Sequence, residues 1–307
     1  MWHGILIINK ERGLTSHQVI AKLRRILKQT EIGHTGTLDP EAEGVLVVGL
    51  GQATRSFSFL DEAIKVYRAE IILGQRTDTQ DASGKVIAEH HETNLAIETI
   101  DRAVMELTGD IRQIPPMYSA VKINGQKLYE LARRGEQVER KARPVTVYNW
   151  TIEEPKPNYG FRESFVSVIT CSKGTYIRTL IDDLGEKLGC GGHMGRLLRL
   201  ESGIFRLDQG VTLEQVSEMA EAGSLNRRII SITEALNHLS SIYLEPADLT
   251  KVINGGKISF YKYNKSVSTE ALVKALETGT DKTVAILKLM DNESNRYWQP
   301  VKVFRYG

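Results

Sequence analysis

The chain has little cysteine: only Cys171 and Cys190 occur among its 307 residues. Two thiols exclude a disulfide scaffold and fit a reducing compartment. Long hydrophobic runs are also missing, because aliphatic stretches such as residues 5–8 and 45–48 are far too short to span a bilayer. The first residues show no basic segment followed by an apolar segment and a small-residue cleavage site. We therefore expect no membrane association, no signal peptide and a cytoplasmic location.

Neither sign of charge dominates, since 40 basic and 38 acidic side chains leave a net charge of +2. The distribution is uneven, however. Basic side chains outnumber acidic ones by six to one in residues 1–30, by seven to three in 122–146 and by ten to six in 247–307, whereas residues 61–110 carry five basic and eleven acidic side chains. Segregated charge can form a positive track for phosphates, although most charge clusters are simply solvated surfaces.

The predicted elements interleave without a regular β-α-β repeat. Apolar periodicity predicts strands at residues 4–8, 45–48, 65–73, 145–152 and 165–171, with 85–87 as a hairpin partner of 65–73. It predicts helices after the capping box of Thr15 and Gln18, at residues 94–107 and at residues 175–188. We expect an α+β fold around a mixed, mainly antiparallel sheet, followed after Leu244 by a small β-rich module.

Three patterns that could indicate ligand sites have simpler explanations. Residues 49–54 (G-L-G-Q-A-T) resemble the start of a dinucleotide fingerprint, but the third glycine is missing. Cys190 and His193 have the spacing of metal ligands, yet the sequence has no second pair. Asp78 and Asp81 fit a turn better than a calcium loop, whose twelve-residue pattern is absent. We expect neither a metal nor a nucleotide cofactor.

The most informative segment is residues 33–46, G-H-T-G-T-L-D-P-E-A-E-G-V-L. Its glycines permit unusual backbone conformations or close approach of a ligand, and Pro40 biases Asp39 toward an extended conformation. A carboxylate held in this way, beside a histidine and two threonines, is typical of a functional acid. It is also typical of a tight turn before a buried strand. Local chemistry leaves both interpretations open.

This segment resembles the catalytic motif of the TruB-type tRNA pseudouridine synthases, and the resemblance implies that Asp39 is the indispensable catalytic residue. Further matching segments are G-T-Y-I-R-T at residues 174–179, K-V-Y at 65–67 and Q-I-P-P-M-Y-S-A-V-K at 113–122. The matches cover nearly all of the larger predicted domain. They imply the pseudouridine synthase fold, with a PUA-like domain after it.

The resemblance also implies roles for three other side chains. Arg178 could simply pair with Asp182 on the same helix face, for about 0.2–0.5 kcal/mol, but by resemblance it pairs with Asp39. Such a pair would lower the pKa of the acid and fix its rotamer. Tyr67 could be an ordinary core residue, but by resemblance it stacks on the flipped base and serves the C5 proton. Leu197 matches an apolar position that lines the uracil pocket.

Three further residues are candidate substrate contacts. His34 could be a core or capping histidine, but by resemblance it occupies the space that the flipped nucleotide leaves, since extrusion of a base opens a gap. Gly36 belongs to the same motif. Lys122 opens the basic stretch of residues 122–146, which corresponds to the family's RNA-gripping insertion. The alternative is a charged, exposed helix around residues 128–131.

The resemblance therefore implies an enzyme that isomerises uridine 55 in the T loop of tRNA. It would flip the base, cleave the glycosidic bond and rejoin C5 to C1′. The expected domains are a catalytic domain at residues 1–241 and an RNA-binding domain at 247–307 that contacts the acceptor end, in a monomer. Two alternatives remain: a tRNA chaperone or scaffold on the same fold, and a dinucleotide-dependent oxidoreductase that uses residues 49–54. Whether Asp39 attacks C1′ or abstracts the 2′ proton stays open.

Overall fold

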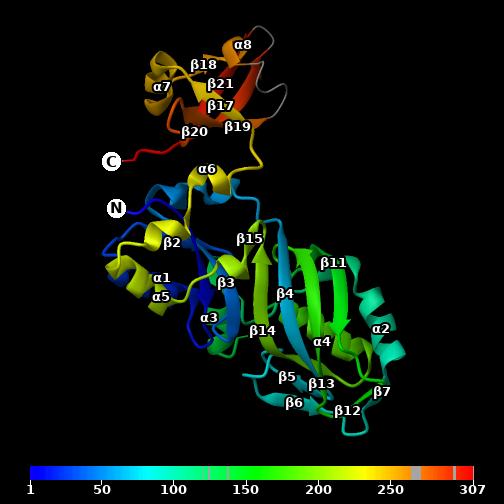
Figure 1. Ribbon diagram of the computed structural model, residues 1–307. Helices are drawn as coiled ribbons and strands as arrows, with labels where there is room; N and C mark the ends of the chain where they lie inside the picture. The colour runs from blue at the N-terminus through cyan, green and yellow to red at the C-terminus, as the bar shows by residue number, and fades with distance from the viewer. Residues whose placement is uncertain (120, 124, 137, 264–270, 293–294, 307) are drawn as a thin grey trace.

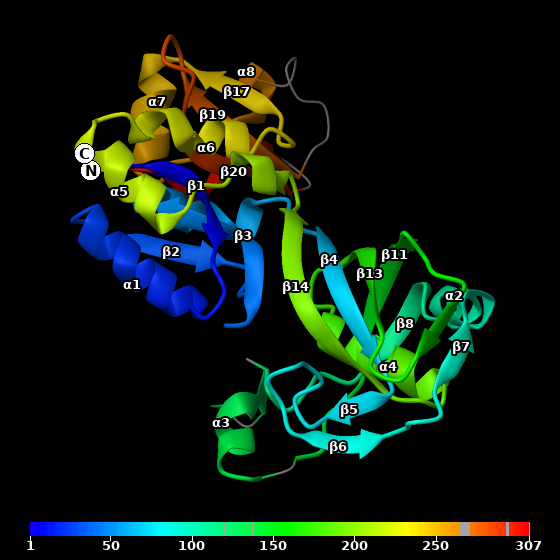
Figure 2. The same cartoon turned by 60° about the horizontal axis from the view of Figure 1, so that its bottom comes forward.

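The computed structural model describes the whole chain except residues 120, 124, 137, 264–270, 293–294 and 307. A large domain on a central sheet lies below a smaller one in Figure 1, with the short helix α6 (Ile232–Ala235) between them. Both chain termini lie on the same side of the molecule, near this junction (Figures 1 and 2).

The central sheet contains ten strands within the described part of the chain. Their order is β16 (Ile229–Ile230), β1 (Gly4–Lys10), β3 (Ala42–Leu50), β14 (Gly192–Ser202), β4 (Ile64–Leu73), β13 (Ser164–Ser172), β11 (Arg143–Glu153) and β8 (Gly109–Gln113), with β2 (Ile32–Thr35) beside β3 and β15 (Phe205–Arg206) beside β14. All neighbouring pairs are antiparallel except β14 and β3. The predicted α+β fold with a mixed, mainly antiparallel sheet is confirmed.

Helices cover the two halves of this sheet separately. The predicted capping box forms: Thr15 Oγ1 accepts from the Gln18 amide, and Gln18 Oε1 accepts from the Thr15 amide. The helix that follows, α1 (Ser16–Ile26), packs with α5 (Leu213–Glu221) over β1 and β3. On the other half, α2 (Ile97–Glu106) and α4 (Ile177–Lys187) pack over β4, β13 and β14. The large domain also contains the 3₁₀ helices η1 (Gly51–Phe59), η2 (Leu207–Gln209) and η3 (Leu225–Arg228).

Two sequence predictions of local structure are wrong in detail. The predicted partner of residues 65–73 forms β6 (Val86–Glu89), but β6 pairs with β5 (Gln75–Thr77). Both edges of β4 are already taken, by β13 and by β14. The helix predicted at 94–107 begins as β7 (Asn94–Ala96), which pairs with β12 (Asn158–Gly160) before α2 starts. In the first case the distant strands β13 and β14 leave β4 no free edge, and in the second the distant strand β12 turns the first residues of the predicted helix into a strand.

The basic stretch forms a small substructure of its own. It contains β9 (Lys122–Ile123), β10 (Gln126–Lys127) and α3 (Leu128–Arg133). Figure 2 shows α3 standing apart from the central sheet. A short helix therefore occurs at residues 128–131, but Leu128 and Leu131 are buried, so it is not the fully exposed helix of the simpler interpretation.

The C-terminal β-rich domain is a separate sheet that shares a core with the large domain. Its strand order is β17 (Ser241–Leu244), β19 (Leu272–Glu277), β20 (Lys282–Asn292), β21 (Asn295–Val303) and β18 (Ile258–Ser259), with helices α7 (Pro246–Ile253) and α8 (Phe260–Tyr263). This sheet starts at Ser241, ahead of the expected start at residue 247. Ile286 and Phe304 pack in one cluster with Ile5 and Ile7 of β1.

Candidate active site

Asp39 lies in the turn between β2 and β3, and the backbone on both sides of it is anchored. Ser16 at the start of α1 donates from Oγ to the Leu38 carbonyl (3.1 Å) and accepts from the Leu38 amide (3.0 Å). The buried Nζ of Lys10 donates to the Pro40 carbonyl (3.1 Å) and to two carbonyls in the loop before α1. Burial lowers the pKa of Lys10 to about 8. These contacts fix the position from which Asp39 projects.

Arg178, the second residue of α4, forms an ion pair with Asp39. Its Nη2 lies 2.8 Å from Asp39 Oδ2, and the arginine side chain is 5% exposed against 41% for the carboxylate. The guanidinium also donates to the carbonyls of Tyr118 (2.8 Å) and Thr79 (3.2 Å), and its Nη1 lies 3.7 Å from Asp81 Oδ2. Arg178 is therefore held by several contacts while its partner Asp39 remains accessible.

The alternative partner of Arg178, Asp182, is engaged elsewhere. Arg76 donates to both of its carboxylate oxygens, at 2.7 and 2.8 Å, and Gln80 donates to one of them at 2.7 Å. The alternative pairing of Arg178 with Asp182 along one face of the helix therefore does not form. The structure instead pairs Arg178 with Asp39, which lies in a distant part of the sequence.

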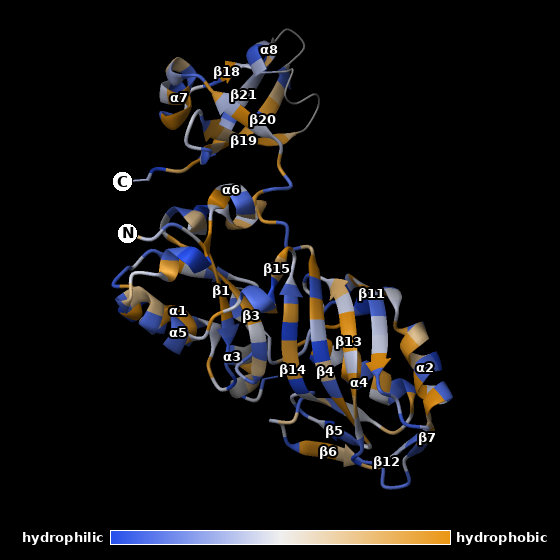
Figure 3. Ribbon diagram, viewed as in Figure 1, coloured by the Kyte–Doolittle hydropathy of each residue, from blue (hydrophilic) through white to orange (hydrophobic). Residues whose placement is uncertain are grey.

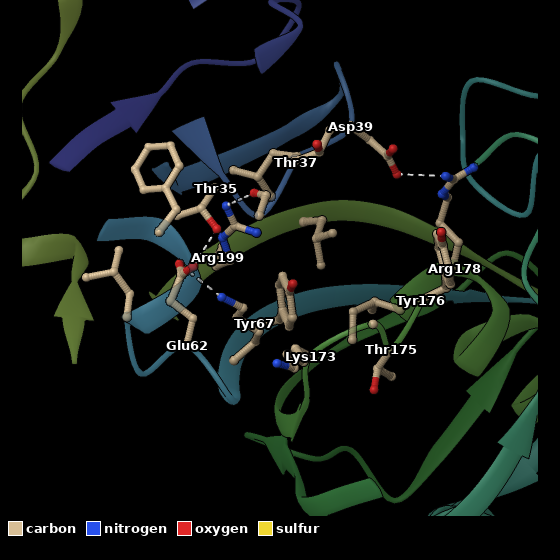
Figure 4. A pocket seen from close by; sticks show the side chains of 18 of the residues that line it. Thr35, Thr37, Asp39, Glu62, Tyr67, Lys173, Thr175, Tyr176, Arg178 and Arg199 are labelled. Carbon is tan, nitrogen blue, oxygen red and sulfur yellow. Dashed lines mark hydrogen bonds and ion pairs between the residues drawn. The ribbon is translucent and has the colours of Figure 1, made fainter. Parts of the chain in front are cut away.

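A cavity of about 440 Å³ lies beside this ion pair, over the centre of the sheet where β3, β14 and β4 meet. Figure 4 shows the side chains that surround it. Its lining comprises Thr35, Gly36, Thr37, Leu38, Asp39, Phe57, Ser58, Leu60, Glu62, Lys65, Tyr67, Lys173, Gly174, Thr175, Tyr176, Ile177, Arg178, Leu197 and Arg199. Asp39, Tyr67, Arg178, Leu197 and Gly36 are thus brought to one cavity.

The polar floor of the cavity contains residues to which the sequence analysis gave no role. Lys65 donates to Glu62 Oε1 (3.3 Å) and to Ser202 Oγ (2.5 Å), while Thr35 donates to Glu62 Oε2 (2.5 Å). Burial lowers the pKa of the Lys65 amine. The buried side chain of Arg199 also lines this part of the cavity. Lys65 lies within the K-V-Y motif and Arg199 lies two residues after Leu197, so proximity to motif positions was the available signal.

The three candidate substrate contacts, His34, Gly36 and Lys122, do not all lie at the cavity. His34 is on β2, outside the residues that line the cavity, with its ring edge-on to His17 at a centroid distance of 5.4 Å. Burial lowers the pKa of His34, and its Nδ1 has no hydrogen-bond partner among the described residues. Gly36 lines the cavity with a backbone φ of +65°, and its carbonyl accepts from Arg199 at 2.6 Å. The backbone of Lys122 lies in β9, but its side chain is outside the described residues.

The three weaker sequence patterns show no ligand geometry. Gly49 is covered by its own chain, because a Cβ there would meet the Phe57 ring at 2.6 Å. Cys190 is buried and donates to the Gly191 carbonyl. Within the described ranges, no three His, Cys, Asp or Glu side chains are placed to share a metal ion. None of the helices described is long and apolar enough to cross a membrane.

Comparison with solved structures defines the class of protein. The chain superposes on a chain of a Cbf5-Nop10-Gar1 complex with a TM-score of 0.73 and 27% identity, over 99% of this chain and 85% of that one. It also superposes on an archaeal box H/ACA sRNP Nop10-Cbf5 complex with a TM-score of 0.71 and 26% identity, over 98% of this chain and 86% of that one. The architecture is thus that of the Cbf5- and TruB-type pseudouridine synthases.

Sequence comparison then identifies the family. Residues 24–177 match the TruB family pseudouridylate synthase N-terminal domain, and residues 178–237 match the tRNA pseudouridylate synthase B C-terminal domain. A tRNA pseudouridine synthase B of Streptococcus pneumoniae serotype 4 is 43% identical over 98% of this chain and 99% of its own. A tRNA pseudouridine synthase B of Geobacter sulfurreducens is 44% identical over 82% of this chain and 81% of its own. The chain belongs to the TruB family of pseudouridine synthases, which are isomerases.

Proposed function

We propose that this chain converts uridine 55 in the T loop of tRNA to pseudouridine. The relatives named tRNA pseudouridine synthase B support tRNA as the substrate. The observation that carries the proposal is the ion pair of Asp39 with the buried Arg178 at the edge of a cavity of about 440 Å³, which can admit a base. This geometry presents a fixed carboxylate to a sugar while the base enters the cavity.

Asp39 is the proposed catalytic carboxylate. Its Oδ2 is held by Arg178, whereas Oδ1 receives no hydrogen bond from any of the described residues. A carboxylate with one oxygen anchored and one unengaged can act on the sugar without losing its orientation. Attack on C1′ and removal of the 2′ proton both begin from this arrangement.

The cavity holds the detached base in the proposed reaction. Tyr67 and Leu197 supply an aromatic ring and an apolar side chain from neighbouring strands. Extrusion of a nucleotide from a stacked loop costs a few kcal/mol, and contacts with these two side chains would offset part of that cost. The Tyr67 hydroxyl is the proposed acceptor of the C5 proton.

Other parts of the chain are proposed to bind the RNA outside the cavity. The basic stretch at residues 122–146 would hold the T arm, with Lys122 as one contact and His34 in the gap that the flipped base leaves. The C-terminal domain, proposed to be PUA-like, would contact the acceptor end through its excess of basic side chains. We propose that the protein acts as a cytoplasmic monomer. We also propose that it needs no cofactor, because the reaction is an internal rearrangement.

The test uses purified protein, a T-arm stem-loop transcript and excess chelator. Pseudouridine should form at position 55 and at no other uridine when mapped by carbodiimide labelling and primer extension. A transcript with cytidine at position 55 is the matched control and should stay unmodified. Tight binding of the wild-type transcript without any pseudouridine would reject the proposed activity and favour the RNA scaffold.

A further inference from the structure

Arg199 is a buried cation without an acidic partner in the described part of the chain. The residue is 1% exposed, and no carboxylate oxygen of the described residues lies within 4.0 Å of its guanidinium. Nε donates to the Val45 carbonyl at 2.7 Å and Nη2 to the Gly36 carbonyl at 2.6 Å. Burial of a charge without a counter-charge is unfavourable. The two carbonyls that accept from Arg199 carry no formal negative charge, so its positive charge also acts on neighbouring groups.

That neighbour is Tyr67. Arg199 on β14 stands directly opposite Tyr67 on β4 in the antiparallel register, and both side chains line the cavity (Figure 4). Residues directly opposite each other on neighbouring strands project to the same face and interact. Burial raises the pKa of Tyr67, while the nearby positive charge of Arg199 opposes this effect.

The other titratable groups that face Tyr67 cannot take the place of Arg199. Asp39 from the β2–β3 turn raises the pKa of Tyr67, and so does Cys171 on β13, a buried thiol whose own pKa is raised to about 11. Lys65, on the same strand as Tyr67, is paired with Glu62. Lys173 is exposed and Arg178 is paired with Asp39. Arg199 is therefore the buried cation that stands opposite Tyr67 and has no acidic partner among the described residues.

We propose that Arg199 is a positioning residue that stabilises the phenolate of Tyr67 and so equips Tyr67 to remove the C5 proton. This inference rests on the proposed function. Once C5 has joined C1′, the C5–H bond breaks and its electron pair forms the C5=C6 double bond. The N1=C6 pair moves to N1, which takes a proton from solvent, and the C5 proton passes to the phenolate oxygen of Tyr67. The resulting phenol returns its proton to solvent before the next turnover.

The direct test titrates residue 67 in the full chain without RNA. A fluorinated tyrosine at position 67, whose lower intrinsic pKa brings the titration into an accessible range, is followed by ¹⁹F NMR. Arg199→Gln and Arg199→Met remove the charge with different side-chain shapes, so one folded variant is enough. Either should raise the titration midpoint by about one pH unit or more. Arg199→Lys, which keeps a charge, should recover part of this shift.

The matched control is Arg196→Gln on the same strand. Arg196 is 71% exposed and 3.4 Å from Glu43, and it does not line the cavity. Its loss should leave the midpoint of residue 67 unchanged. A midpoint that moves equally in both variants would show a general charge effect and overturn the proposal.

The kinetic arm measures single-turnover pseudouridine formation against pH with natural Tyr67. The rising limb of the profile should move to higher pH in Arg199→Gln or Arg199→Met, with a loss of about tenfold or more at neutral pH and partial rescue by Arg199→Lys. An equal loss of rate at every pH, with an unchanged ¹⁹F titration midpoint, would overturn the proposal and leave Arg199 with a structural role only. Absence of pseudouridine with the wild-type chain would instead reject the proposed function, whatever the ¹⁹F midpoints show.

Discussion

The guanidinium of Arg178 lies between two carboxylates, Asp39 at 2.8 Å and Asp81 at 3.7 Å. Asp81 is itself buried, and its Oδ1 accepts from Thr79 Oγ1 and Ser83 Oγ at 2.8 and 2.5 Å. The same loop thus holds Asp81 rigidly against Arg178, in addition to forming the turn that the sequence predicts. Arg178 in turn orients Asp39.

We predict that Asp81→Asn slows single-turnover pseudouridine formation by about 10- to 100-fold, because small displacements of reacting groups cost rates of this order. The dissociation constant for a T-arm stem-loop should change less than threefold. Asp78→Asn in the same loop is the control, since exposed Asp78 accepts only from the Lys85 amide among the described residues. Equal losses in the two variants would indicate disruption of the loop and not of Arg178.

How much of the site the sequence predicts depends on the kind of interaction. The pairing of Arg178 with Asp39 follows from a recognised motif, and the structure shows it at hydrogen-bonding distance. The placement of Arg199 opposite Tyr67 does not follow, because nothing in one chain segment reveals which residue of another strand stands opposite it. Strand register is set by the assembled sheet. The catalytic roles of these residues remain predictions.

Lys10, at the end of β1, ties that strand to the Asp39 turn through the Pro40 carbonyl. Its pKa is lowered from 10.5 to about 8, since burial disfavours the charged amine. At this position the unfolded chain therefore binds more protons than the folded chain between about pH 8 and 10.5, so the contribution of Lys10 to stability rises over this range.

We predict that the difference in free energy of unfolding between wild type and Lys10→Met grows by about 2–3 kcal/mol from pH 7 to pH 10. The methionine variant has no titrating group at this position and supplies the baseline. Urea denaturation at both pH values measures the difference. A constant difference would mean that Lys10 titrates alike in the folded and unfolded chains.

The parallel contact between β3 and β14 depends on a glycine. Gly44 has a φ of +98°, and a Cβ there would collide with the backbone carbonyl oxygen of Arg199. The backbones of Gly44 and Arg199 cannot move apart to admit a side chain without separating β3 from β14, the two strands that carry the cavity. Gly189, after α4, also has a positive φ (+72°), but a Cβ there would meet nothing within 4 Å.

Gly44→Ala should destabilise the fold by more than about 3 kcal/mol, since it combines backbone strain with a steric clash. Gly189→Ala should cost only about 1 kcal/mol, from strain alone. Urea unfolding of both variants compares the two effects. Similar losses would show that the β3–β14 contact tolerates a side chain.

At the scale of elements, the sequence predicts well wherever one face of an element is buried. Alternation along β4 and periodicity along α1 and α4 match the structure within a few residues. Figure 3 shows hydrophobic and hydrophilic residues mixed along β14, which is buried on parts of both faces and gives no simple pattern. The order of strands was unpredictable because many partners are far apart in the sequence. β6 was misassigned because the distant strands β13 and β14 occupy both edges of β4.

At the scale of the whole molecule, the two sheets are joined by a common core and cannot be separated cleanly. Ile286 and Phe304 pack with Ile5 and Ile7, and Lys274 donates to the carbonyls of Thr233 and Leu236. Removal of residues 241–307 would expose this core. A loss of activity after truncation would therefore report on stability as well as on RNA binding, and surface substitutions are the better test.

Lys257→Ala combined with Lys302→Ala should weaken binding of whole tRNA and lower the salt dependence of its affinity by about one to two counterions. Neither lysine has an ion-pair partner among the described residues. An isolated T-arm stem-loop should bind as before, because it has no acceptor end. Lys85→Ala in the acidic segment of the large domain is the control. Equal weakening for both RNAs would contradict a role confined to the acceptor end.

The central claim is that Asp39, held by Arg178, performs the chemistry and not the binding. The most direct measurement compares wild type and Asp39→Asn in single-turnover pseudouridine formation and in T-arm affinity, at saturating enzyme and equal ionic strength. We predict no detectable pseudouridine from the variant and a dissociation constant within about threefold of wild type, since phosphate contacts supply most of the affinity. Turnover by Asp39→Asn at the wild-type rate would contradict the account.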